Sequence, residues 1–359
     1  MNVYRALIRP AAFLLPAETA HHLGLWALRQ SRAWEALRPV FTFADPVLHQ
    51  HAGGLDLRNP VGVAPGFDKD CEVMRGLASL GFGFVEAGTV MPTPREGNPG
   101  PRLLRYVDQA ALANCLGLPS RGVNGCADSL RRWRGRGLSA VPVIVSFMGF
   151  TLDEYVAGFR ALQPLADALE VALRCPNTPD EQNFVSRGEF ATLLTELMRF
   201  REKPLWVKLP SLDVEVDRDH LADLVETSLR GGVDGFMVSG TRPVVEPRLS
   251  RGRGSLSGRP VLGRTMTAVR EVYRVTRGRA AIVAQGGIGS AEDAFAAILA
   301  GANAVSIYTQ FVYEGPGLAR RINRELVTLM RAHGVASIRE LCGREQTITV
   351  RVAREARSG

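Results

Sequence analysis

The protein has 359 residues, 46% of them hydrophobic and 22% charged, which is typical of a globular chain large enough to bury a sizeable core. Lysine and arginine exceed aspartate and glutamate by eight, but no basic stripe interleaved with aromatic residues is present, so nucleic-acid binding is not expected. The five cysteines form no Cys-x-x-Cys pair and the six histidines form no convincing cluster, so neither a disulfide framework nor a metal site is indicated.

Residues 1–45 are predicted to form two short amphipathic helices. In the second, which follows Pro16, apolar side chains recur at helical spacing, and arginines flank both helices. No uncharged apolar run reaches the roughly 18 residues of a transmembrane helix, and Arg9 and Glu18 interrupt any signal-peptide core. The pattern alone leaves two interpretations open: a helix pair that lies on a membrane surface, or a helical cap packed on the main domain.

From about residue 55 onward, short apolar runs alternate with longer helical stretches such as 293–300. Eight runs are candidate strands: 61–65, 84–87, 141–147, 169–173, 205–209, 235–239, 281–284 and 304–307. Continuous apolar runs are typical of strands covered on both faces, so the pattern predicts an α/β protein with an eight-stranded parallel (β/α)8 TIM barrel. A doubly wound open sheet is the alternative, but no Gly-x-Gly-x-x-Gly sequence opens the first helix. The segment after residue 335 is predicted to be a last helix on the barrel.

Polar residues and glycines follow the predicted strands. The carboxyl ends of barrel strands build the active site in this fold. The fourth run is followed by a thiol and an amide, Cys175 and Asn177, although alone this segment is equally consistent with a free cysteine before an ordinary Pro-Asn turn. Gly286-Gly287 after the seventh run and Tyr308-Thr309 after the eighth stand where the standard phosphate site of the fold lies, which predicts a flavin or another phosphorylated ligand.

Several sequence blocks carry a family resemblance over nearly the whole chain. They are residues 16–21, 59–69, 88–90, 101–105, 175–179, 256–260 and 286–288, together with Asn114 and Gly117. In these blocks the chain resembles the dihydroorotate dehydrogenases, specifically their quinone-linked, membrane-associated class 2 branch. The 59–69 block and the Pro-Asn-Thr-Pro run are specific, whereas the glycine pairs are not.

The resemblance implies an FMN-dependent oxidation of (S)-dihydroorotate to orotate in pyrimidine and UMP biosynthesis, with electrons passed to quinone. It implies an FMN-binding barrel at 46–345, preceded by a membrane and quinone-access region at 1–45 and followed by a basic tail at 346–359. The enzyme would be peripheral to the cytoplasmic face of the membrane. No metal is expected.

The resemblance also assigns site residues. Those expected to line FMN are Ala64, Gly66, Lys69, Thr89, Ser146, Lys208, Ser239, Gly258, Gly287, Tyr308 and Thr309. Lys69, Asn114, Asn177 and Thr241 are expected to face the substrate, and His21 and Arg105 to lie along the quinone path. Cys175 is the expected base, and Lys208 would stabilise negative charge that develops on the flavin.

The chain also departs from the family pattern. Class 2 members use serine as the base where this chain has Cys175. Cysteine at this position is typical of the soluble class 1 enzymes. A thiol, with an ordinary pKa of about 8.5, is a better base than a hydroxyl. Ala172 and Gly240 stand where the family has asparagines that face the substrate, and Ser146 replaces a family asparagine near the flavin. Losing the two hydrogen bonds at positions 172 and 240, at about 1.5–3 kcal/mol each, would weaken substrate binding roughly 10²–10⁴-fold if nothing replaces them.

Three functions therefore stay open from the sequence. The first is a class 2 dihydroorotate dehydrogenase with repacked substrate contacts. The second is a paralogous FMN oxidoreductase that acts on another cyclic amide or enone and still passes electrons to quinone. The third is a flavin-binding protein of the same fold with little catalysis, which serves an interaction role.

Overall fold

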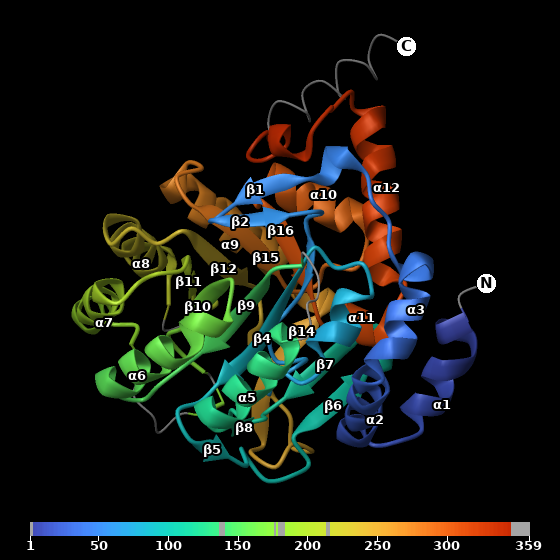
Figure 1. Cartoon of the computed structure of the whole chain (residues 1–359), viewed down its shortest axis with the longest axis horizontal. Helices are drawn as coiled ribbons and strands as arrows, with labels where there is room; N and C mark the ends of the chain where they lie inside the picture. The colour runs from blue at the N-terminus through green and yellow to red at the C-terminus, as the bar shows by residue number, and fades with distance from the viewer. Residues whose placement is uncertain (1–2, 136–140, 176, 179–183, 213–215, 346–359) are drawn as a thin grey trace.

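A closed barrel of eight parallel strands forms the centre of the protein (Figure 1). The computed structural model describes residues 3–135, 141–175, 177–178, 184–212 and 216–345. The barrel strands are β3 (Val61–Val63), β4 (Phe84–Val90), β9 (Val143–Phe147), β10 (Ala168–Ala172), β11 (Leu205–Lys208), β12 (Gly235–Ser239), β15 (Ala281–Gln285) and β16 (Ala304–Ile307). Each pairs in parallel with the next, and β16 closes the barrel on β3. The predicted (β/α)8 barrel is confirmed, and every one of the eight predicted runs overlaps a barrel strand.

Helices surround the barrel. They are α4 (Met74–Ala78), α5 (Gly122–Arg134), α6 (Leu152–Leu162), α7 (Arg187–Arg199), α8 (Arg218–Arg230), α9 (Leu262–Thr276), α10 (Ala291–Leu299), α11 (Thr309–Glu314) and α12 (Leu318–Ala332). Short turns of 3-10 helix are η2 (Pro46–Leu48), η3 (Val107–Gln109), η4 (Gln163–Leu165), η5 (Arg259–Val261) and η6 (Ile338–Glu340). Several helices begin where the sequence provides a cap: the side chains of Thr151, Ser186, Asp217 and Ser290 each accept a hydrogen bond from the backbone three residues on.

The predicted helix after residue 335 is wrong. The last long helix, α12, ends at Ala332, and Gly334 follows it with a φ of 64°. Val335 N then donates to Met330 O at 2.9 Å, a closing bond that satisfies a carbonyl of the last turn. Between Val335 and Glu345, where the described residues end, the single turn η6 is the one helical element, and Ile338 and Leu341 are its buried anchors.

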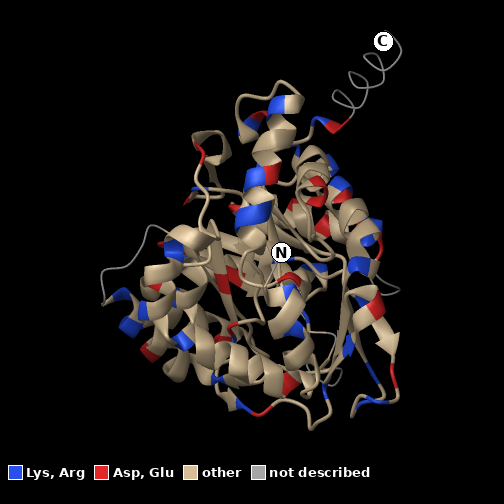
Figure 2. Ribbon diagram, turned by 90° about the vertical axis from the view of Figure 1, so that its right-hand side faces the viewer, with Lys and Arg blue, Asp and Glu red and all other residues tan. Residues whose placement is uncertain are grey.

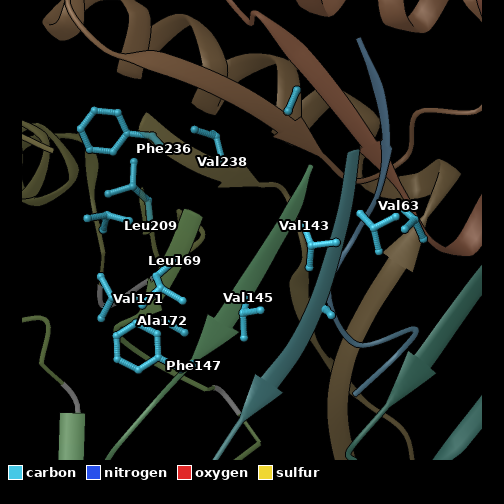
Figure 3. Close-up of a cluster of buried hydrophobic side chains, with 14 of the residues drawn as sticks. Val63, Val143, Val145, Phe147, Leu169, Val171, Ala172, Leu209, Phe236 and Val238 are labelled. Carbon is cyan, nitrogen blue, oxygen red and sulfur yellow. The ribbon is translucent and has the colours of Figure 1, made fainter. Parts of the chain in front are cut away.

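Apolar side chains such as Val143, Val145 and Leu169 fill the space between the barrel strands and the surrounding helices (Figure 3). A separate apolar cluster that includes Phe84 and Ile144 fills the lower part of the barrel interior. Near the amino ends of the strands, a hairpin of β1 (Gln50–Ala52) and β2 (Leu55–Leu57) closes the barrel. Trp206 packs beneath this hairpin and donates from Nε1 to Gly53 O at 3.1 Å. With this end sealed, ligands can reach the interior only at the carboxyl ends of the strands.

A second sheet extends the open end of the barrel. It is antiparallel, with the order β13 (Arg242–Val245), β14 (Arg253–Gly258), β7 (Ala111–Asn114) and β6 (Leu103–Tyr106). A short pair, β5 (Pro94–Arg95) and β8 (Ser120–Arg121), lies beside it. The sheet joins an excursion after β4 to one after β12, and sequence analysis did not predict it.

The N-terminal helices lie against α11, α12 and β6 at one side of the barrel (Figure 1). Two helices were expected, but the structure has three helical segments: η1 (Tyr4–Ile8) running into α1 (Arg9–Phe13), then α2 (Ala17–Arg29) and α3 (Ser31–Phe41). Gln30, with a ψ of 56°, breaks the second from the third. Of the helices in the described part of the chain, none is both long and apolar enough to cross a membrane.

Charged residues are spread over the helices and loops (Figure 2). Many arginines are paired with carboxylates, for example Arg201 with Asp234 at 2.8 Å and Arg331 with Asp45 at 3.0 Å. In this view of the described residues, Lys and Arg alternate with Asp and Glu and do not form one basic stripe.

Candidate active site

The carboxyl ends of the barrel strands enclose a cavity of about 210 Å³, here named the strand-end cavity. Seven residues predicted to contact a flavin line it: Ala64, Gly66, Lys208, Ser239, Gly287, Tyr308 and Thr309. Its floor is formed by Gln285 and Ser306, which are neighbours on β15 and β16. The barrel topology brings these residues, which come from different strand ends, to one place.

Glycines leave the walls of the strand-end cavity open. Gly66 has a φ of 93°, and a Cβ built on it would meet no atom within 4 Å. Its amide donates to Gly88 O at 2.6 Å, which fixes the turn after β3. Gly286 and Gly287 have φ values of 115° and 81°, a conformation that side chains other than glycine rarely adopt. Open space is therefore present over Gly66, whereas a Cβ on Gly287 would lie 2.7 Å from Leu262, so the packing against α9 requires this glycine.

A second cavity, of about 220 Å³, lies beside the first and contains Cys175; it is named the Cys175 cavity. Lys208, Ser239, Thr241 and Asn114 line both cavities, so the two adjoin. The carbonyl of Cys175 accepts hydrogen bonds from both the amide and the hydroxyl of Thr178, at 3.2 and 3.1 Å. This turn holds the half-buried thiol at the carboxyl end of β10.

Amide and hydroxyl groups line the Cys175 cavity in two pairs. Asn177 Nδ2 donates to Asn114 Oδ1 at 3.1 Å, which places two amide side chains from β7 and from the turn after β10 side by side. Thr241 Oγ1 lies 3.0 Å from Ser211 Oγ, so the loops after β11 and β12 also meet. The cavity therefore presents donors and acceptors to a polar ring on two sides.

Lys69 lies in a further cavity, of about 470 Å³, between the loop after β3 and helix α2. Its Nζ donates to Gly66 O at 2.6 Å. Burial lowers the pKa of Lys69 to about 8, with Arg102 adding to the effect, while Asp70 and Glu18 act in the opposite direction. The amino group therefore titrates much closer to neutral pH than an ordinary lysine.

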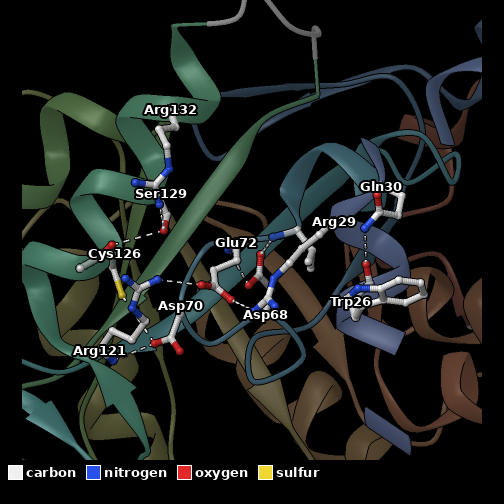
Figure 4. A network of polar contacts seen from close by, with 12 residues as sticks. Trp26, Arg29, Gln30, Asp68, Asp70, Glu72, Arg121, Cys126, Ser129 and Arg132 are labelled. Atoms are coloured by element: carbon white, nitrogen blue, oxygen red, sulfur yellow. Dashed lines mark hydrogen bonds and ion pairs between the residues drawn. The ribbon is translucent and has the colours of Figure 1, made fainter. Parts of the chain in front are cut away.

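A polar network holds the loop that carries Lys69 (Figure 4). Asp68 is buried and accepts hydrogen bonds from the amides of Glu72 and Val73, each at 2.8 Å. Burial nevertheless raises the pKa of Asp68 to about 6. Glu72 pairs with Arg29 of α2 on one side and with Arg121 at 2.7 Å on the other. The loop is thereby anchored both to the N-terminal helices and to the start of α5.

A largely apolar cavity of about 290 Å³ separates the N-terminal helices from the barrel and is named the hairpin cavity. His21 and Arg105, the two residues predicted for the quinone path, both line it. Burial lowers the pKa of His21 to about 3, and the nearby Lys69 adds to the effect, so the imidazole is neutral at physiological pH. Arg105 lies over the Phe13 ring at 4.5 Å and donates to Phe13 O at 3.1 Å.

Comparison with known proteins identifies the family. A family described as dihydroorotate dehydrogenase matches residues 47–330 of this chain. The chain belongs to the dihydroorotate dehydrogenase family. It is therefore an oxidoreductase.

Relatives in this family resemble the chain over its whole length. It is 39% identical over 356 residues to a protein named dihydroorotate dehydrogenase (quinone) from Roseiflexus sp. (strain RS-1), covering 96% of this chain and 99% of the relative. A protein of the same name from Deinococcus deserti is 39% identical over 367 residues, covering 95% and 99%. The crystal structure of an Eimeria tenella DHODH in complex with ferulenol superposes with a TM-score of 0.78 at 28% identity, covering 91% and 95%.

Most of the predicted site residues line these cavities, but two do not. Thr89, Asn114, Asn177, Thr241 and Cys175 line the Cys175 cavity, and Lys69 lines its own. Ser146 is fully buried and its hydroxyl lies 3.0 Å from Thr89 Oγ1, so it stands behind the cavity wall. Gly258 also lies behind the wall, where a Cβ would approach Ala110 O to 2.4 Å.

Some residues around the site were missed by sequence reasoning. Arg242 and Ser255 line the Cys175 cavity from the antiparallel sheet, and no local signal in the sequence connects them to β10. Arg174, which the sequence places next to Cys175 as a neighbouring positive charge, also lines this cavity. The two arginines place positive charge near the groups that would meet an anionic substrate.

The family asparagine that Gly240 replaces does not fit the present packing. A Cβ on Gly240 would lie 2.3 Å from Thr265 Oγ1 and 2.5 Å from Thr265 N, because the start of α9 packs directly against this turn. This packing leaves no room for a side chain at position 240. Ala172 differs: it lines the Cys175 cavity, and its carbonyl accepts a hydrogen bond from Tyr155 OH at 2.6 Å.

We expect Gly240→Ala to lower the free energy of unfolding by about 1–3 kcal/mol, since overpacking forces neighbouring atoms to shift. Gly263→Ala is the matched control: the residue lies in the first turn of α9, where an added methyl group would meet no atom within 4 Å, and the change should be neutral or stabilising. Urea unfolding measures both. Equal free energies of unfolding for the two variants would contradict this prediction and show that α9 can shift away from residue 240 at little cost in stability.

Proposed function

We propose that this protein oxidises (S)-dihydroorotate to orotate and passes the electrons to quinone, with FMN held in the strand-end cavity. The observation that carries the proposal is the arrangement of the cavities. Leu103, Leu112 and Tyr308 line both the strand-end cavity and the hairpin cavity, so one wall separates them. The Cys175 cavity opens on another side of the strand-end cavity. A redox group between the two would meet a polar substrate on one side and an apolar acceptor on the other.

The residues of the strand-end cavity suit FMN. The open space over Gly66 leaves room for a ring close to the backbone, and Gly286 and Gly287 line the same cavity. Ser306 Oγ at the floor is buried and has no hydrogen-bond partner among the described residues. Bound FMN would supply the hydride acceptor and the route for electrons to quinone. Lys208, Ser239 and Thr309 would hold its polar edges.

Side chains of the Cys175 cavity would perform the remaining chemistry. Cys175 would remove the proton from the substrate carbon next to the one that loses hydride. The paired Asn114 and Asn177, with Thr241, would hydrogen-bond the ring amides and orient the ring. Lys69 would supply positive charge for the substrate carboxylate, with its amino group already positioned by Gly66 O.

Residues 1–45 would form the quinone-access and membrane-docking region, and 46–345 the FMN-binding barrel. The proposed basic tail at 346–359 lies outside the described residues. The neutral imidazole of His21 and the guanidinium of Arg105 are the polar groups available to quinone oxygens in the hairpin cavity. The enzyme would sit peripherally on the cytoplasmic face of the membrane.

Exposed apolar side chains on the N-terminal helices support the membrane contact. Leu14 is 88% exposed and Trp26 61% exposed. We expect the double change Leu14→Glu and Trp26→Glu to weaken binding to phosphatidylcholine–phosphatidylglycerol vesicles by at least about tenfold, since each buried apolar side chain contributes about 1.5–3 kcal/mol. Val245→Glu is the control, because Val245 is 83% exposed on β13, at the far edge of the antiparallel sheet. Vesicle flotation in which all three proteins bind equally would contradict membrane docking through these helices.

The function itself is tested by anaerobic titration of the FMN-loaded protein with L-dihydroorotate, followed by the oxidised-flavin absorbance. Stoichiometric bleaching, with recovery on addition of a ubiquinone analogue, is the expected result. A flavoprotein that dithionite reduces but millimolar dihydroorotate does not would exclude orotate chemistry. A protein that takes up no FMN would exclude the flavoenzyme altogether.

A further inference from the structure

Two glutamates are buried together inside the barrel, below the strand-end cavity. Glu86 on β4 and Glu170 on β10 are both 0% exposed. They lie on the two strands that flank β9, where Glu86 is in register with Ile144 and Glu170 with Ser146. Neither lines the strand-end, Cys175 or hairpin cavity, and neither was assigned a role by the sequence.

The hydrogen bonds of this pair are incomplete. Gln285 Nε2 donates to Glu86 Oε2 at 2.5 Å, but Glu86 Oε1 and both oxygens of Glu170 have no hydrogen-bond partner among the described residues. Ser306 faces Glu86 without a hydrogen bond of normal geometry. A buried carboxylate without hydrogen-bond donors lowers the free energy of unfolding, and two neighbouring negative charges lower it further.

One cation faces the pair. Lys208 Nζ on β11 lies 3.9 Å from Glu170 Oε1, too far for a hydrogen bond but close enough for a strong ionic attraction in a buried site. The groups that face Glu86 are Glu170, Lys208, Gln285 and Ser306, from four other strands. Two carboxylates and one ammonium would leave a net negative charge in the barrel interior.

A proton on one carboxyl removes this imbalance. Burial raises the pKa of Glu86 well above its ordinary value, the repulsion from Glu170 raises it further, and Lys208 opposes both effects. With Glu86 neutral, Glu170 and Lys208 form a balanced ion pair. Lys208, Gln285 and Ser306 also line the strand-end cavity, so the charge of this cluster acts directly on whatever lies there.

We propose that Glu86 is protonated and that the carboxylate of Glu170 positions Lys208 and sets the charge that a bound flavin meets. The inference rests on the proposed FMN site. In this arrangement Glu170 is a positioning residue that acts through Lys208, and the proton on Glu86 keeps the cluster neutral. The positive charge of Lys208 is then balanced by Glu170. Reduction of the flavin is therefore less favoured than it would be beside an unpaired lysine.

Two isosteric variants test the charge. Glu86→Gln replaces a neutral group by a neutral group, so the flavin midpoint potential should stay that of the wild type. The double variant Glu86→Gln, Glu170→Gln leaves Lys208 without a counter-ion, and the two-electron equilibrium should shift at least tenfold toward reduction, about 30 mV. Comparing the double variant with Glu86→Gln isolates the charge of Glu170, because Glu86 can no longer ionise to replace it.

Infrared spectroscopy of the flavin-free protein provides a second measurement. A protonated carboxyl band at neutral pH that disappears in Glu86→Gln is expected. The inference is overturned if this band is absent from the wild type, if Glu86→Gln alone raises the potential, or if the double variant has the potential of Glu86→Gln. A protein that takes up no FMN would defeat the proposed function, while the infrared comparison would still decide whether the pair holds a proton.

Discussion

Replacing Cys175 with alanine should slow dihydroorotate-driven flavin reduction by roughly 10²–10⁴-fold, the range expected for loss of a general base. The thiol is the proposed base, and the turn after β10 holds it in the Cys175 cavity, which Asn177 and Lys208 also line. FMN content should not change, because Cys175 does not line the strand-end cavity. Anaerobic stopped-flow absorbance measures the reduction rate, and the visible spectrum measures the bound flavin.

Cys175→Ser is the matched comparison, since it keeps a group that can accept a proton. We expect it to react faster than Cys175→Ala and more slowly than the wild type at neutral pH, because a hydroxyl is a weaker base than a thiol. Reoxidation by quinone should be equal in all three proteins. If Cys175→Ala reduces its flavin at the wild-type rate, another group is the base.

Loss of the Lys69 charge should weaken binding of orotate by about 2 to 5 kcal/mol, the cost of truncating one member of a buried charge pair. This corresponds to roughly thirty- to a few thousandfold in Kd for Lys69→Met. Lys69 donates to Gly66 O, and Gly66 lines the strand-end cavity, so the amino group lies next to that cavity. Titration of the flavin absorbance with orotate measures the Kd.

The same lysine should make orotate binding depend on pH. Because burial lowers its pKa to about 8, Lys69 is cationic below that pH and loses its charge as the pH rises through it. Orotate Kd should therefore be constant below about pH 7.5 and rise toward tenfold per pH unit above about pH 8. Lys69→Arg keeps a charged guanidinium throughout and should show a flat profile. A flat profile for the wild type between about pH 7 and 9 would contradict this role for Lys69.

Local sequence patterns were sufficient to predict the barrel. Each barrel strand is a short apolar run covered on both faces, so its signal lies within a few residues and does not depend on distant partners. The order of the strands around the barrel then follows from the chain order, and with it the gathering of residues such as Gly66, Lys208 and Thr309 at one end.

What the sequence could not predict depends on contacts between distant segments. The antiparallel sheet pairs Ser255 with Asn114, 141 residues apart, and neither strand has a strong apolar alternation of its own. Arg242 enters the site only through this pairing. From the sequence, glycine in place of the family asparagine at position 240 indicated the loss of a hydrogen bond. In the structure, Thr265 of α9 packs where a side chain at this position would lie. The burial of Glu86 and Glu170 beneath the site likewise required the closed barrel.

The ties between the N-terminal helices and the barrel mean that this region is not a detachable anchor. Glu18 of α2 pairs with Arg102 at 2.8 Å, and Arg29 of the same helix pairs with Glu72 on the loop that carries Lys69. A shortened protein, made to improve solubility, would lose one of the two supports of that loop. The substrate specificity of this enzyme should therefore be measured on protein that keeps residues 1–45.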